Sequence, residues 1–393
     1  MELLRQNEAE MNIPTLVNAA LGLSADDLRR YSRHLVIPQI SIEGQERLKS
    51  AKVVCIGAGG LGSPILMYLA GAGVGTLGIV EYDTVDESNL QRQIIYGQSD
   101  IGKSKAEIAT LRIAEINPLI KVITHNVKLD NLNVMEIFKE YDLIIDGTDN
   151  FATRYLINDA CVLLSKPYIW GSVLRFDGQV SVFWSQYGPC YRCLHPEPSM
   201  DAPNCAEAGV LGVLCASIGS IQATEAIKLI TGIGEPLIGS LIVYDALAMS
   251  FRSLNLSKDP ECVVCGENPT LVTLLEDYED LLSPIRSSEI SAIELKSKYD
   301  KGEDFFLVDV REPHEYEIVH IPGGQLIPIA GFLDGSALAS MPRDREIILY
   351  CRSGVRSANA LAILNDAGFN RSAHVTGGVL AWAKHVDPTC TVY

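Results

Sequence analysis

The feature that most constrains the fold is the stretch KVVCIGAGGLGSPILMYLAGAGVG, residues 52–75, in which glycines separate two apolar runs. Gly57, Gly59 and Gly62 match the spacing G-x-G-x-x-G, a strand-to-helix turn that lets the backbone approach a diphosphate. Residues 53–80 contain no charge and could span a bilayer, but they carry eight glycines and a proline. The stretch therefore predicts a strand, a turn, a helix and a second strand. It leaves open whether the bound nucleotide is NAD or ATP.

Length and composition indicate an ordinary globular protein. The chain has 393 residues, of which 47% are hydrophobic and 21% charged, enough for about two or three domains. The formal net charge of −17 argues against nucleic-acid binding, which leaves a basic footprint, and against an anionic membrane. The first residues, MELLRQNEAEMNIP, are acidic where a signal peptide needs a basic start. We therefore expect a soluble, cytoplasmic protein with no nucleic-acid or membrane partner.

Strand and helix patterns alternate along the first part of the chain. Residues 24–48 have helical spacing, with Ser24 as a candidate N-cap. After the glycine stretch we expect a strand at 75–83, a helix at 103–117, a strand at 121–129, a helix at 131–140, and a strand with its loop at 142–150. This alternation predicts a parallel, doubly wound α/β sheet.

A second, smaller α/β domain is expected towards the C-terminus. The segment that begins at 269 is acidic, contains prolines and predicts a linker. Strands are then expected at 305–312 and 346–354, with a helix at 357–368. We therefore divide the chain into an N-terminal extension (1–23), a nucleotide-binding domain (24–268), a linker (269–286) and a small α/β domain (287–393).

Charged residues near the expected carboxyl edge of the sheet favour ATP over NAD. Glu81 lies 19 residues beyond Gly62, where an acid can bind a ribose hydroxyl pair of either nucleotide. Arg92 and Lys105 add positive charge, which a triphosphate needs more than a diphosphate held by loop amides. Asp149 follows the strand DLIID and suits a magnesium ligand. The alternative interpretation places Arg92 and Lys105 on an ordinary solvated face.

Seven motifs in a fixed order resemble those of one family. RYSRHL, GAGGLG, DESNLQRQ, TDNFATR, CYRC, NCAEAG and CVVC closely resemble the molybdopterin-synthase adenylyltransferases, in the ThiF/MoeB branch of the ubiquitin-activating superfamily. The resemblance covers residues 24–268. It implies a Rossmann-like sheet, binding of ATP with Mg²⁺, and adenylation of the C-terminal glycine of a small ubiquitin-like sulfur-carrier protein.

The resemblance also implies roles for individual residues. Glu81 would bind the ribose, where many relatives have Asp, and Asp149 would hold Mg²⁺ at the acyl-phosphate centre with Arg154 nearby. Arg33 would reach across a homodimer interface in the manner of an arginine finger. The implied nucleotide-binding set is Gly57, Gly59, Gly60, Gly62, Glu81, Ser88, Asn89, Arg92, Lys105, Asp149, Asn150, Arg154 and Arg33, with Arg92, Asp149 and Cys205 as catalytic residues.

Ten cysteines in a chain without a secretory signal predict metal binding or reactivity rather than disulfides. Cys190 and Cys193 form one C-x-x-C pair and Cys262 and Cys265 another, which together predict a closed, structural Zn²⁺ site. Redox pairs and four buried thiols are the alternatives. Cys205 matches the family cysteine that links covalently to the carrier, with a packing role as its alternative. The cysteines expected only to pack are Cys55, Cys161, Cys215 and Cys390.

Cys351 ends a predicted strand and begins the tight turn CRSGVRS before a helix. The turn amides, the helix N-terminus, Arg352 and Arg356 all favour a thiolate at this sulfur. A tyrosine phosphatase has its arginine six positions after the cysteine, where this chain has Ser357, so the loop suits a persulfide instead. With FFLVDVREPHEYEIVHIPGG and VTGGVLAW, the turn resembles the rhodanese sulfurtransferases over residues 287–393. The resemblance implies a persulfide on Cys351 and framework roles for Asp309, Arg311 and His320.

The two domains together predict two coupled reactions. An adenylate is an electrophile, a persulfide has a transferable outer sulfur, and a shared chain raises their effective concentration. We expect an adenylyltransferase and sulfurtransferase, resembling the MoeZ-like enzymes, that gives its carrier a C-terminal thiocarboxylate for molybdopterin, thiamine, cysteine or tRNA thiolation. A cysteine desulfurase is the expected sulfur donor. The main alternative is a non-catalytic nucleotide-binding scaffold for carrier proteins. An NAD-dependent oxidoreductase is disfavoured, because no Tyr-x-x-x-Lys pair lies near the site.

Overall fold

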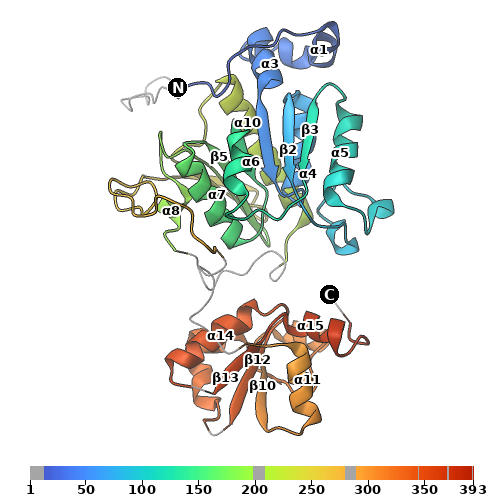
Figure 1. The fold of residues 1–393 in the computed structure, drawn as a ribbon, viewed down its shortest axis with the longest axis vertical. Coiled ribbons are helices and arrows are strands. Elements are labelled where there is room, and N and C mark those ends of the chain that lie inside the picture. Colours follow the sequence, from blue (N-terminus) through green and yellow to red (C-terminus); the bar gives the residue numbers. More distant parts are fainter. Residues whose placement is uncertain (1–12, 198–208, 279–288, 344, 370, 392) are drawn as a thin grey trace. The chain divides into compact units, whose positions relative to one another are not determined.

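The structure is a computed structural model that describes residues 13–197, 209–278 and 289–393, except 344, 370 and 392. Contacts divide the described chain into two compact units, residues 13–278 and residues 289–393 (Figure 1). Each unit has its own sheet, with eight strands in the larger unit and five in the smaller.

The larger unit is built on a sheet with the strand order β3-β2-β1-β4-β5-β6-β7-β8. Its first five members are parallel: β1 (Lys52–Ile56), β2 (Thr76–Val80), β3 (Lys121–His125), β4 (Leu143–Asp146) and β5 (Tyr168–Leu174). The order reverses between β1 and β4, which is the switch point where doubly wound sheets bind ligands at the carboxyl ends of their strands. The glycine turn and the loop after DLIID therefore meet at the expected place.

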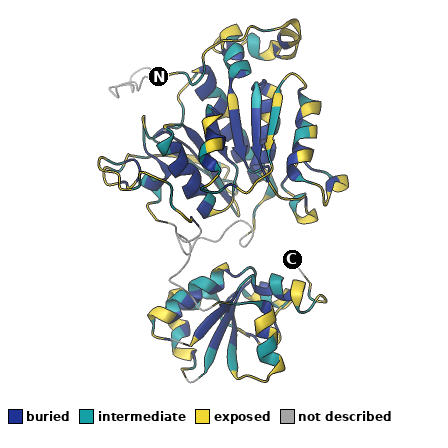
Figure 2. Cartoon of the chain, viewed as in Figure 1, coloured by how far each residue is buried: buried dark blue, intermediate teal, exposed yellow. Residues whose placement is uncertain are grey.

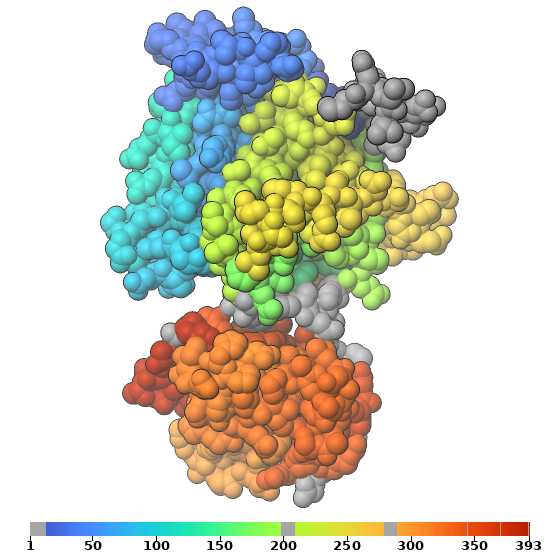
Figure 3. Space-filling model, turned by 180° about the vertical axis from the view of Figure 1, so that it is seen from behind, coloured from blue at the N-terminus to red at the C-terminus, as the bar shows by residue number. Residues whose placement is uncertain are grey.

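The remaining strands make this sheet mixed rather than wholly parallel. They are β6 (Asp177–Phe183), β7 (Ser240–Asp245) and β8 (Ser250–Asn255), and they pair antiparallel from β5 onward. Only Arg175 and Phe176 separate β5 from β6, too few residues for the crossover that parallel strands require. The expected parallel sheet is thus confirmed for the strands from which it was predicted, and β6, β7 and β8 extend it as antiparallel strands. β8 is the edge strand and is mostly exposed; Figure 3 shows yellow segments of this part at the surface.

Helices cover the sheet and bury its apolar side chains (Figure 2). They are α4 (Gly62–Ala72), α5 (Lys105–Ile116), α6 (Val134–Lys139), α7 (Phe151–Leu163), α8 (Tyr191–Leu194) and α10 (Gly212–Thr231), with the short 3₁₀ turns η1 (Glu87–Asn89) and η2 (Gln98–Asp100). Residues of α4, α5 and α10 share one core cluster with Val53, Cys55 and Ile145, which lie on the same face of their strands. Alternate residues of these strands therefore face the same core, as the two-residue period of a β-strand predicts.

The N-terminal helical segment is broken into three helices, α1 (Ala25–Arg30), α2 (Ser32–Leu35) and α3 (Ser41–Ser50). The expected N-cap is confirmed, since the Ser24 hydroxyl accepts the Asp27 amide and the Asp27 carboxylate accepts the Ser24 amide. The helical pattern does not run unbroken from 24 to 48, because Pro38 cannot continue a helix hydrogen bond. Residues 13–17, within the expected extension, pack on the core through Ile13, Leu16 and Val17.

One helix of the described chain is long and apolar enough to cross a membrane, namely α10. Of its 18-residue apolar window, 56% is buried inside the larger unit, and it packs against α4, β5 and β6. Burial of this kind is typical of a core helix.

The smaller unit is a parallel sheet with helices on both faces. The strand order is β11-β10-β12-β13-β9, formed by β9 (Glu289–Ile290), β10 (Phe305–Asp309), β11 (Gln325–Leu326), β12 (Glu346–Tyr350) and β13 (Ser372–Val375). Ile347 and Leu349 of β12 join one core cluster, and Ile348 and Tyr350 join the other. The helices are α11 (Ala292–Asp300), α12 (Pro313–Ile318), α13 (Ile329–Leu333), η4 (Ser336–Ser340), α14 (Val355–Asp366) and α15 (Gly378–His385).

Candidate functional site

The glycine turn follows β1 and leads directly into α4. Gly57 has a φ of +87°, in the region that favours glycine, and a Cβ there would lie 3.2 Å from the Gly147 oxygen. A Cβ on Gly62 would lie 2.1 Å from the Gly57 oxygen, so the turn cannot close around a larger residue. The amide and hydroxyl of Ser63 both donate to the Gly59 oxygen, at 2.9 and 2.7 Å. The glycines thus bring β1, α4 and the end of β4 together.

Glu81 lies at the end of β2 with its carboxylate against the glycine turn. Oε2 accepts the Ala58 amide at 3.0 Å, and Oε1 accepts the amides of Tyr82 and Asp83 at 2.8 and 2.9 Å. The side chain is only 7% exposed. A carboxylate has about four acceptor positions, so these three bonds leave about one for a ribose hydroxyl. The expected ribose role stays a prediction, and the structure adds a role in holding the turn.

Arg92 lies against the same turn. A Cβ on Gly60 would be 3.6 Å from Arg92 Cγ, and the guanidinium donates to the Ser88 carbonyl at 3.0 Å. The Ser88 amide and hydroxyl donate to the Asp86 carboxylate at 2.8 and 2.6 Å, and the Asn89 side chain accepts the Asp86 amide at 3.2 Å. These bonds shape η1, which presents Arg92 beside Gly60 while Ser88 stays exposed.

Lys105 is the first residue of α5 and is buried. Its ammonium lies 3.2 Å from the carboxylate of Asp83, which is itself 53% exposed. The Tyr96 hydroxyl lies 2.8 Å from the Ala58 oxygen and 3.4 Å from the Lys105 oxygen. Tyr96 therefore joins the start of α5 to the glycine turn. Because Asp83 is exposed, a phosphate can replace it as the partner of Lys105.

The turn after β4 contains two acids in different environments. Oδ1 of Asp146 accepts the amide and hydroxyl of Thr148 at 2.8 and 2.7 Å, whereas Oδ2 has no hydrogen-bond partner among the described residues. Burial raises the pKa of Asp146, and the charge of Arg154 opposes that shift. Asp149, by contrast, is exposed, and Asn150 is the N-cap of α7. Asp149 is thus exposed to solvent, whereas the Asn150 side chain caps α7.

Arg154 lies in the first turn of α7 and is 6% exposed. Its guanidinium donates to the Ser172 hydroxyl at 3.2 Å and to the Thr148 carbonyl at 3.4 Å. The guanidinium carbon also lies 5.3 Å from the centre of the Phe151 ring and 5.8 Å from that of Trp170. These contacts position Arg154 between the β4 turn and β5.

One predicted site residue, Arg33, lies on a helix outside the glycine turn. Arg33 is exposed on α2 and forms no hydrogen bond or ion pair with any residue that the structure describes. Cys205 lies outside the described residues.

The four cysteines of the two C-x-x-C pairs lie together. Their sulfur atoms are all within 4.8 Å of one another, with distances of 3.8 Å for Cys190–Cys193, 3.6 Å for Cys190–Cys262 and 3.4 Å for Cys193–Cys265. Tetrahedral zinc with Zn–S bonds of about 2.3 Å places its sulfurs about 3.8 Å apart. The geometry is therefore compatible with zinc, which a spacing in sequence could only suggest.

The residues inside the first pair anchor this cluster to α7. The Arg192 guanidinium donates to both oxygens of Asp159 at 2.8 Å, and the Tyr278 hydroxyl donates to the same carboxylate at 2.9 Å. The Tyr191 amide donates to the side chain of Asn158 at 2.8 Å. Tyr278 lies within the expected linker, so residues up to 278 pack on the larger unit.

Cys351 follows β12 and is completely buried. Its sulfur accepts the Gly354 amide at 3.1 Å and lies 3.7 Å from the Ser357 hydroxyl. Gly354 has a φ of +106°, which the tight turn into α14 requires. The expected strand, turn and helix around this cysteine are therefore present, with a backbone donor aimed at the sulfur.

The sequence analysis expected Arg352 and Arg356 to act on the sulfur through their charge. In the structure both arginines are paired with other groups. Arg356 donates to both oxygens of Glu315 at 2.7 and 2.8 Å, and Tyr393 donates to the same carboxylate at 3.0 Å. Burial raises the pKa of Glu315, but these bonds outweigh burial and lower the pKa to about 2. The Arg352 guanidinium donates to the backbone oxygen of Tyr393 at 2.9 Å. An acid far away in sequence thus balances a charge that was expected to act on the sulfur.

Of the expected framework residues, Asp309 and Arg311 are completely buried and His320 is exposed. Asp309 and Arg311 form an ion pair that is completely buried, and Arg311 also donates to the Val319 oxygen at 2.6 Å. The His320 ring stacks on Tyr316 with a centroid distance of 4.1 Å. Of the cysteines expected to pack, Cys55, Cys161 and Cys215 are buried and Cys390 is half-buried.

Two family models match the chain, the ThiF family over residues 31–264 and the rhodanese-like domain over residues 291–385. The chain is 52% identical over 396 residues to the probable adenylyltransferase/sulfurtransferase MoeZ of Mycobacterium tuberculosis, with 97% of this chain and 99% of that protein covered. It is 40% identical to the adenylyltransferase and sulfurtransferase MOCS3-2 of Zea mays, over 95% of this chain and 82% of the relative. The sulfur carrier protein adenylyltransferase of Thermus thermophilus is 52% identical, over 65% of this chain and 96% of that protein.

A solved structure shares the fold of the larger unit. The crystal structure of E. coli MccB has a TM-score of 0.57 at 22% identity, covering 63% of this chain and 75% of that chain. At this identity the likeness shows the fold alone. The chain belongs to the ThiF family and carries a rhodanese-like domain. It is an adenylyltransferase and sulfurtransferase that uses ATP, so the resemblance, the fold class and the enzyme class expected from the motifs are confirmed.

Several residues of these sites escaped the sequence analysis. Asp146 could have been found, because it is the last residue of the apolar strand that precedes the TDNFATR motif, and a buried acid is unusual there. Tyr96, Asp159 and Glu315 carry no such local signal, since each gains its importance from a partner on another element.

Proposed function

We propose that the chain uses ATP to activate the C-terminal glycine of a small ubiquitin-like sulfur-carrier protein, and then converts that glycine to a thiocarboxylate with sulfur held on Cys351. Support comes from relatives named for both activities and from one named for sulfur carrier proteins. One observation carries the proposal: a single chain contains two sites. The first is a glycine turn with Arg92 and Lys105 beside it, and the second is Cys351, whose sulfur accepts a backbone amide.

The adenylation step turns a poor electrophile into a good one. A carboxylate would have to expel oxide, so its attack on the α-phosphorus of ATP forms an acyl adenylate and releases pyrophosphate. The amides of the glycine turn and the N-terminus of α4 would bind phosphate oxygens, and Arg92 would stabilise the charge that develops there. Lys105 would exchange Asp83 for a phosphate, and Glu81 would offer its remaining acceptor position to the ribose.

Asp149 and Arg33 complete this proposed site. Asp149 is exposed at the carboxyl edge of β4 and would hold Mg²⁺, which offsets phosphate charge when it is bound. Arg33 would act in the partner subunit of a homodimer, consistent with its exposure and its lack of a partner among the described residues. Arg154 would orient the β4 turn that bears Asp149.

The sulfur step needs a persulfide on Cys351, for which a cysteine desulfurase is the proposed donor. The outer sulfur attacks the carbonyl carbon of the adenylate, AMP leaves, and the carrier is joined to Cys351 through an acyl disulfide. A second thiol then attacks the inner sulfur and releases the thiocarboxylate; Cys205 is one candidate for covalent chemistry with the carrier. These reactions need reduced thiols, which favours the cytoplasm.

Zinc is proposed for the four-cysteine cluster, with a structural role. All four positions of the tetrahedral shell are filled by cysteines, which leaves no open position for a substrate. The cluster would hold α8 and the 262–265 turn together and, through Arg192 and Asp159, would support the helix that carries Arg154.

The experiment is a reconstitution with purified protein, a diglycine-tailed carrier, Mg²⁺ and ATP. Wild type is expected to catalyse carrier-dependent exchange of pyrophosphate into ATP and, with a persulfide donor added, to produce AMP and a thiocarboxylated carrier. Asp149→Ala is expected to abolish exchange while the melting temperature is kept, because Asp149 is exposed. Glu115→Ala, which removes a carboxylate that is 72% exposed, is the matched control.

Undiminished exchange in Asp149→Ala would contradict the role of that residue. Nucleotide binding without release of pyrophosphate by the wild type would instead favour the non-catalytic scaffold.

A further inference from the structure

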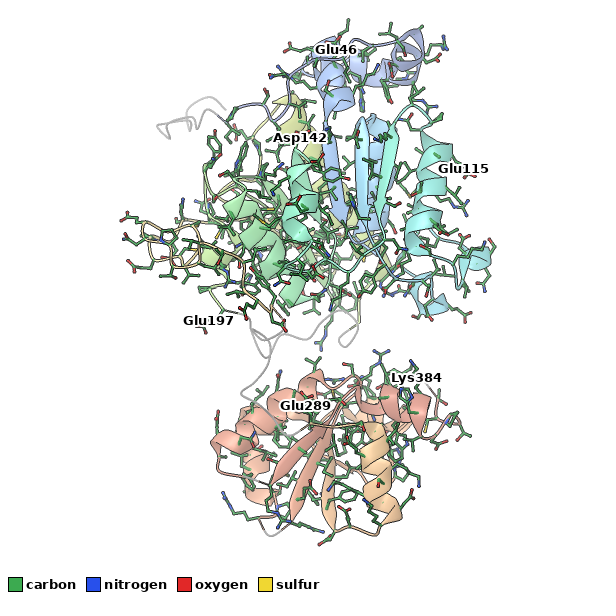
Figure 4. All side chains as sticks on the ribbon, viewed as in Figure 1. Glu46, Glu115, Asp142, Glu197, Glu289 and Lys384 are labelled. Carbon is green, nitrogen blue, oxygen red and sulfur yellow. The ribbon has the colours of Figure 1, made fainter. Side chains whose placement is uncertain are left out.

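The core behind Cys351 contains polar side chains that the proposed sulfur chemistry does not use. Ser357 of α14 is completely buried, and His374 of β13 is 4% exposed. Ser357 Oγ lies 3.7 Å from Cys351 Sγ and 3.4 Å from His374 Nδ1. On the far side of the ring, His374 Nε2 lies 3.6 Å from Oε1 of Glu289. The three contacts form a chain from the sulfur to an acid that is 59% exposed and is labelled in Figure 4.

These side chains come from separate elements, so no local turn explains their meeting. β13 pairs with β12 on one side and with β9 on the other, which brings His374 level with Glu289. The strand neighbour on the other side is Leu349, a buried apolar residue. Burying a polar ring in such a core costs free energy unless its nitrogens are used. The placement therefore points to a function for the ring beyond packing.

The charge of Glu289, 3.6 Å from Nε2 and just beyond hydrogen-bond distance, influences which nitrogen of the ring accepts a proton. A carboxylate beside Nε2 favours the tautomer with hydrogen on Nε2, which leaves the lone pair of Nδ1 directed at Ser357. Burial lowers the pKa of His374, and Glu289 opposes that shift. The charged side chains of the turn after Cys351 are Arg352 and Arg356, which donate to the Tyr393 backbone oxygen and to Glu315; Ser357 carries no charge and Leu349 is apolar. The resting ring is therefore neutral and able to accept a proton.

The Ser357 hydroxyl can serve both neighbours by rotation. Its Oγ lies 2.9 Å from the Gly354 oxygen as well as near Cys351 and His374. Rotation about the C–O bond moves its single hydrogen between these acceptors without moving a heavy atom. A hydroxyl with such freedom can take a proton from one neighbour while it gives its own to another.

We propose that Ser357 and His374 form a proton relay that converts the Cys351 thiol to the thiolate, an inference that rests on the proposed role of Cys351 as sulfur carrier. The S–H bond of Cys351 breaks as an O–H bond forms at Ser357. The original O–H bond of Ser357 breaks as an N–H bond forms at His374 Nδ1. The products are a thiolate, an unchanged hydroxyl and an imidazolium that faces Glu289. Ser357 touches the reacting sulfur, and His374 is a positioning residue that acts through it.

Thiosulfate is a suitable probe for the next step. The thiolate attacks the outer sulfur, a new S–S bond forms on Cys351, the S–S bond of thiosulfate breaks, and sulfite leaves with the electron pair. No oxidant or reductant is needed. Thiosulfate stays a dianion from about pH 6 to about pH 9.5, so the pH profile of the rate reports groups on the protein, the cysteine above all.

The test measures the rate at which the intact full-length chain gains the mass of one sulfur atom, across that pH range, at a saturating concentration of thiosulfate. Ser357→Ala and His374→Gln are each expected to move the midpoint of the profile upward by about one unit and to slow the reaction about tenfold at neutral pH. Above about pH 9 their rates should meet that of wild type, because the thiol then ionises without help. The double variant should be no slower than the slower single variant, because the two residues act in series.

A matched control is His385→Gln, which changes an exposed histidine at the end of α15 and should leave the profile unchanged. An unshifted midpoint in His374→Gln overturns the relay, whether its rate is normal or reduced by one factor at every pH. The second pattern identifies a purely structural role. Cys351→Ala separates the two proposals: persistence of the sulfur adduct in that variant refutes the sulfur-carrier role itself, whereas its loss leaves the relay to be judged by the profiles.

Discussion

The guanidinium of Arg192 and the carboxylate of Asp159 form a buried, bidentate ion pair with both N–O distances at 2.8 Å. Arg192 lies between the cysteines of the first C-x-x-C pair, and Asp159 lies on α7, whose first turn carries Arg154. The pair therefore connects the four-cysteine cluster to Arg154 at the start of α7.

Removing one member of this pair should destabilise the larger unit. Asp159→Ala leaves the Arg192 charge buried without its partner, and we expect the free energy of unfolding to fall by about 3–5 kcal/mol. Urea unfolding measures the change. The matched control, Glu136→Ala, breaks the exposed pair with Lys139 and should cost less than about 1 kcal/mol. Equal losses in the two variants would contradict the importance of the buried pair.

Metal analysis should find about one zinc ion per chain when the protein is purified without chelator. Cys265→Ser should lose that zinc, because an incomplete shell binds weakly, and the melting temperature should fall. Cys390→Ser, which changes a half-buried cysteine of the smaller unit, should keep both. Zinc-free wild type with an unchanged melting temperature would remove the metal from the proposal.

The glycine turn offers a pair of substitutions on one helix with opposite expected signs. In Gly62→Ala, the new Cβ would lie 2.1 Å from the Gly57 oxygen, so the turn must open, and ATP should no longer raise the melting temperature. Gly71→Ala, near the end of the same α4, meets nothing within 4 Å. It should stabilise the chain by about 0.5–1 kcal/mol and leave ATP binding intact. Retained ATP binding in Gly62→Ala would disprove the close approach.

The Glu315–Arg356 pair predicts an acid-sensitive contribution to stability. The pKa of Glu315 falls from an ordinary 4.5 to about 2 in the folded chain. As the pH falls, the folded state therefore binds this proton at a lower pH than the unfolded state does. The stabilisation is therefore complete above pH 4.5 and is lost as the pH falls towards 2. The difference in unfolding free energy between wild type and Glu315→Gln should shrink over that interval. Hydrogen exchange of β12 peptides in urea, compared at equal pH, measures it, and a constant difference would contradict the assignment.

Local features were predictable because their causes lie within a few residues. Glycine at 62 is required by a turn that closes over five residues, and the Ser24 cap bonds to a residue three positions away. The strands that precede Gly57 and Cys351 are short apolar runs ended by a turn, and the structure has both. The order of the motifs identified the family, and with it the fold class and the enzyme class.

The features that were missed depend on residues distant in the chain. The antiparallel pairing of β6, β7 and β8 depends on the two-residue turn between β5 and β6 and on the long helix α10, which lies between β6 and β7 in the chain. The charge of Arg356 was misjudged because its partner, Glu315, is 41 residues away on another helix. No local pattern could have indicated that the free cation would be neutralised.

The order of residues alone settled what kinds of chemistry this chain can perform: glycines where a backbone must turn tightly, paired thiols, and one cysteine at a strand end. Packing settled which of those groups meet, since a contact such as Cys190–Cys262 or Ser357–His374 exists only after long loops have closed and whole strands have aligned. Closing a loop has an entropic cost that depends on the whole fold, whereas a turn or a cap depends only on its neighbours.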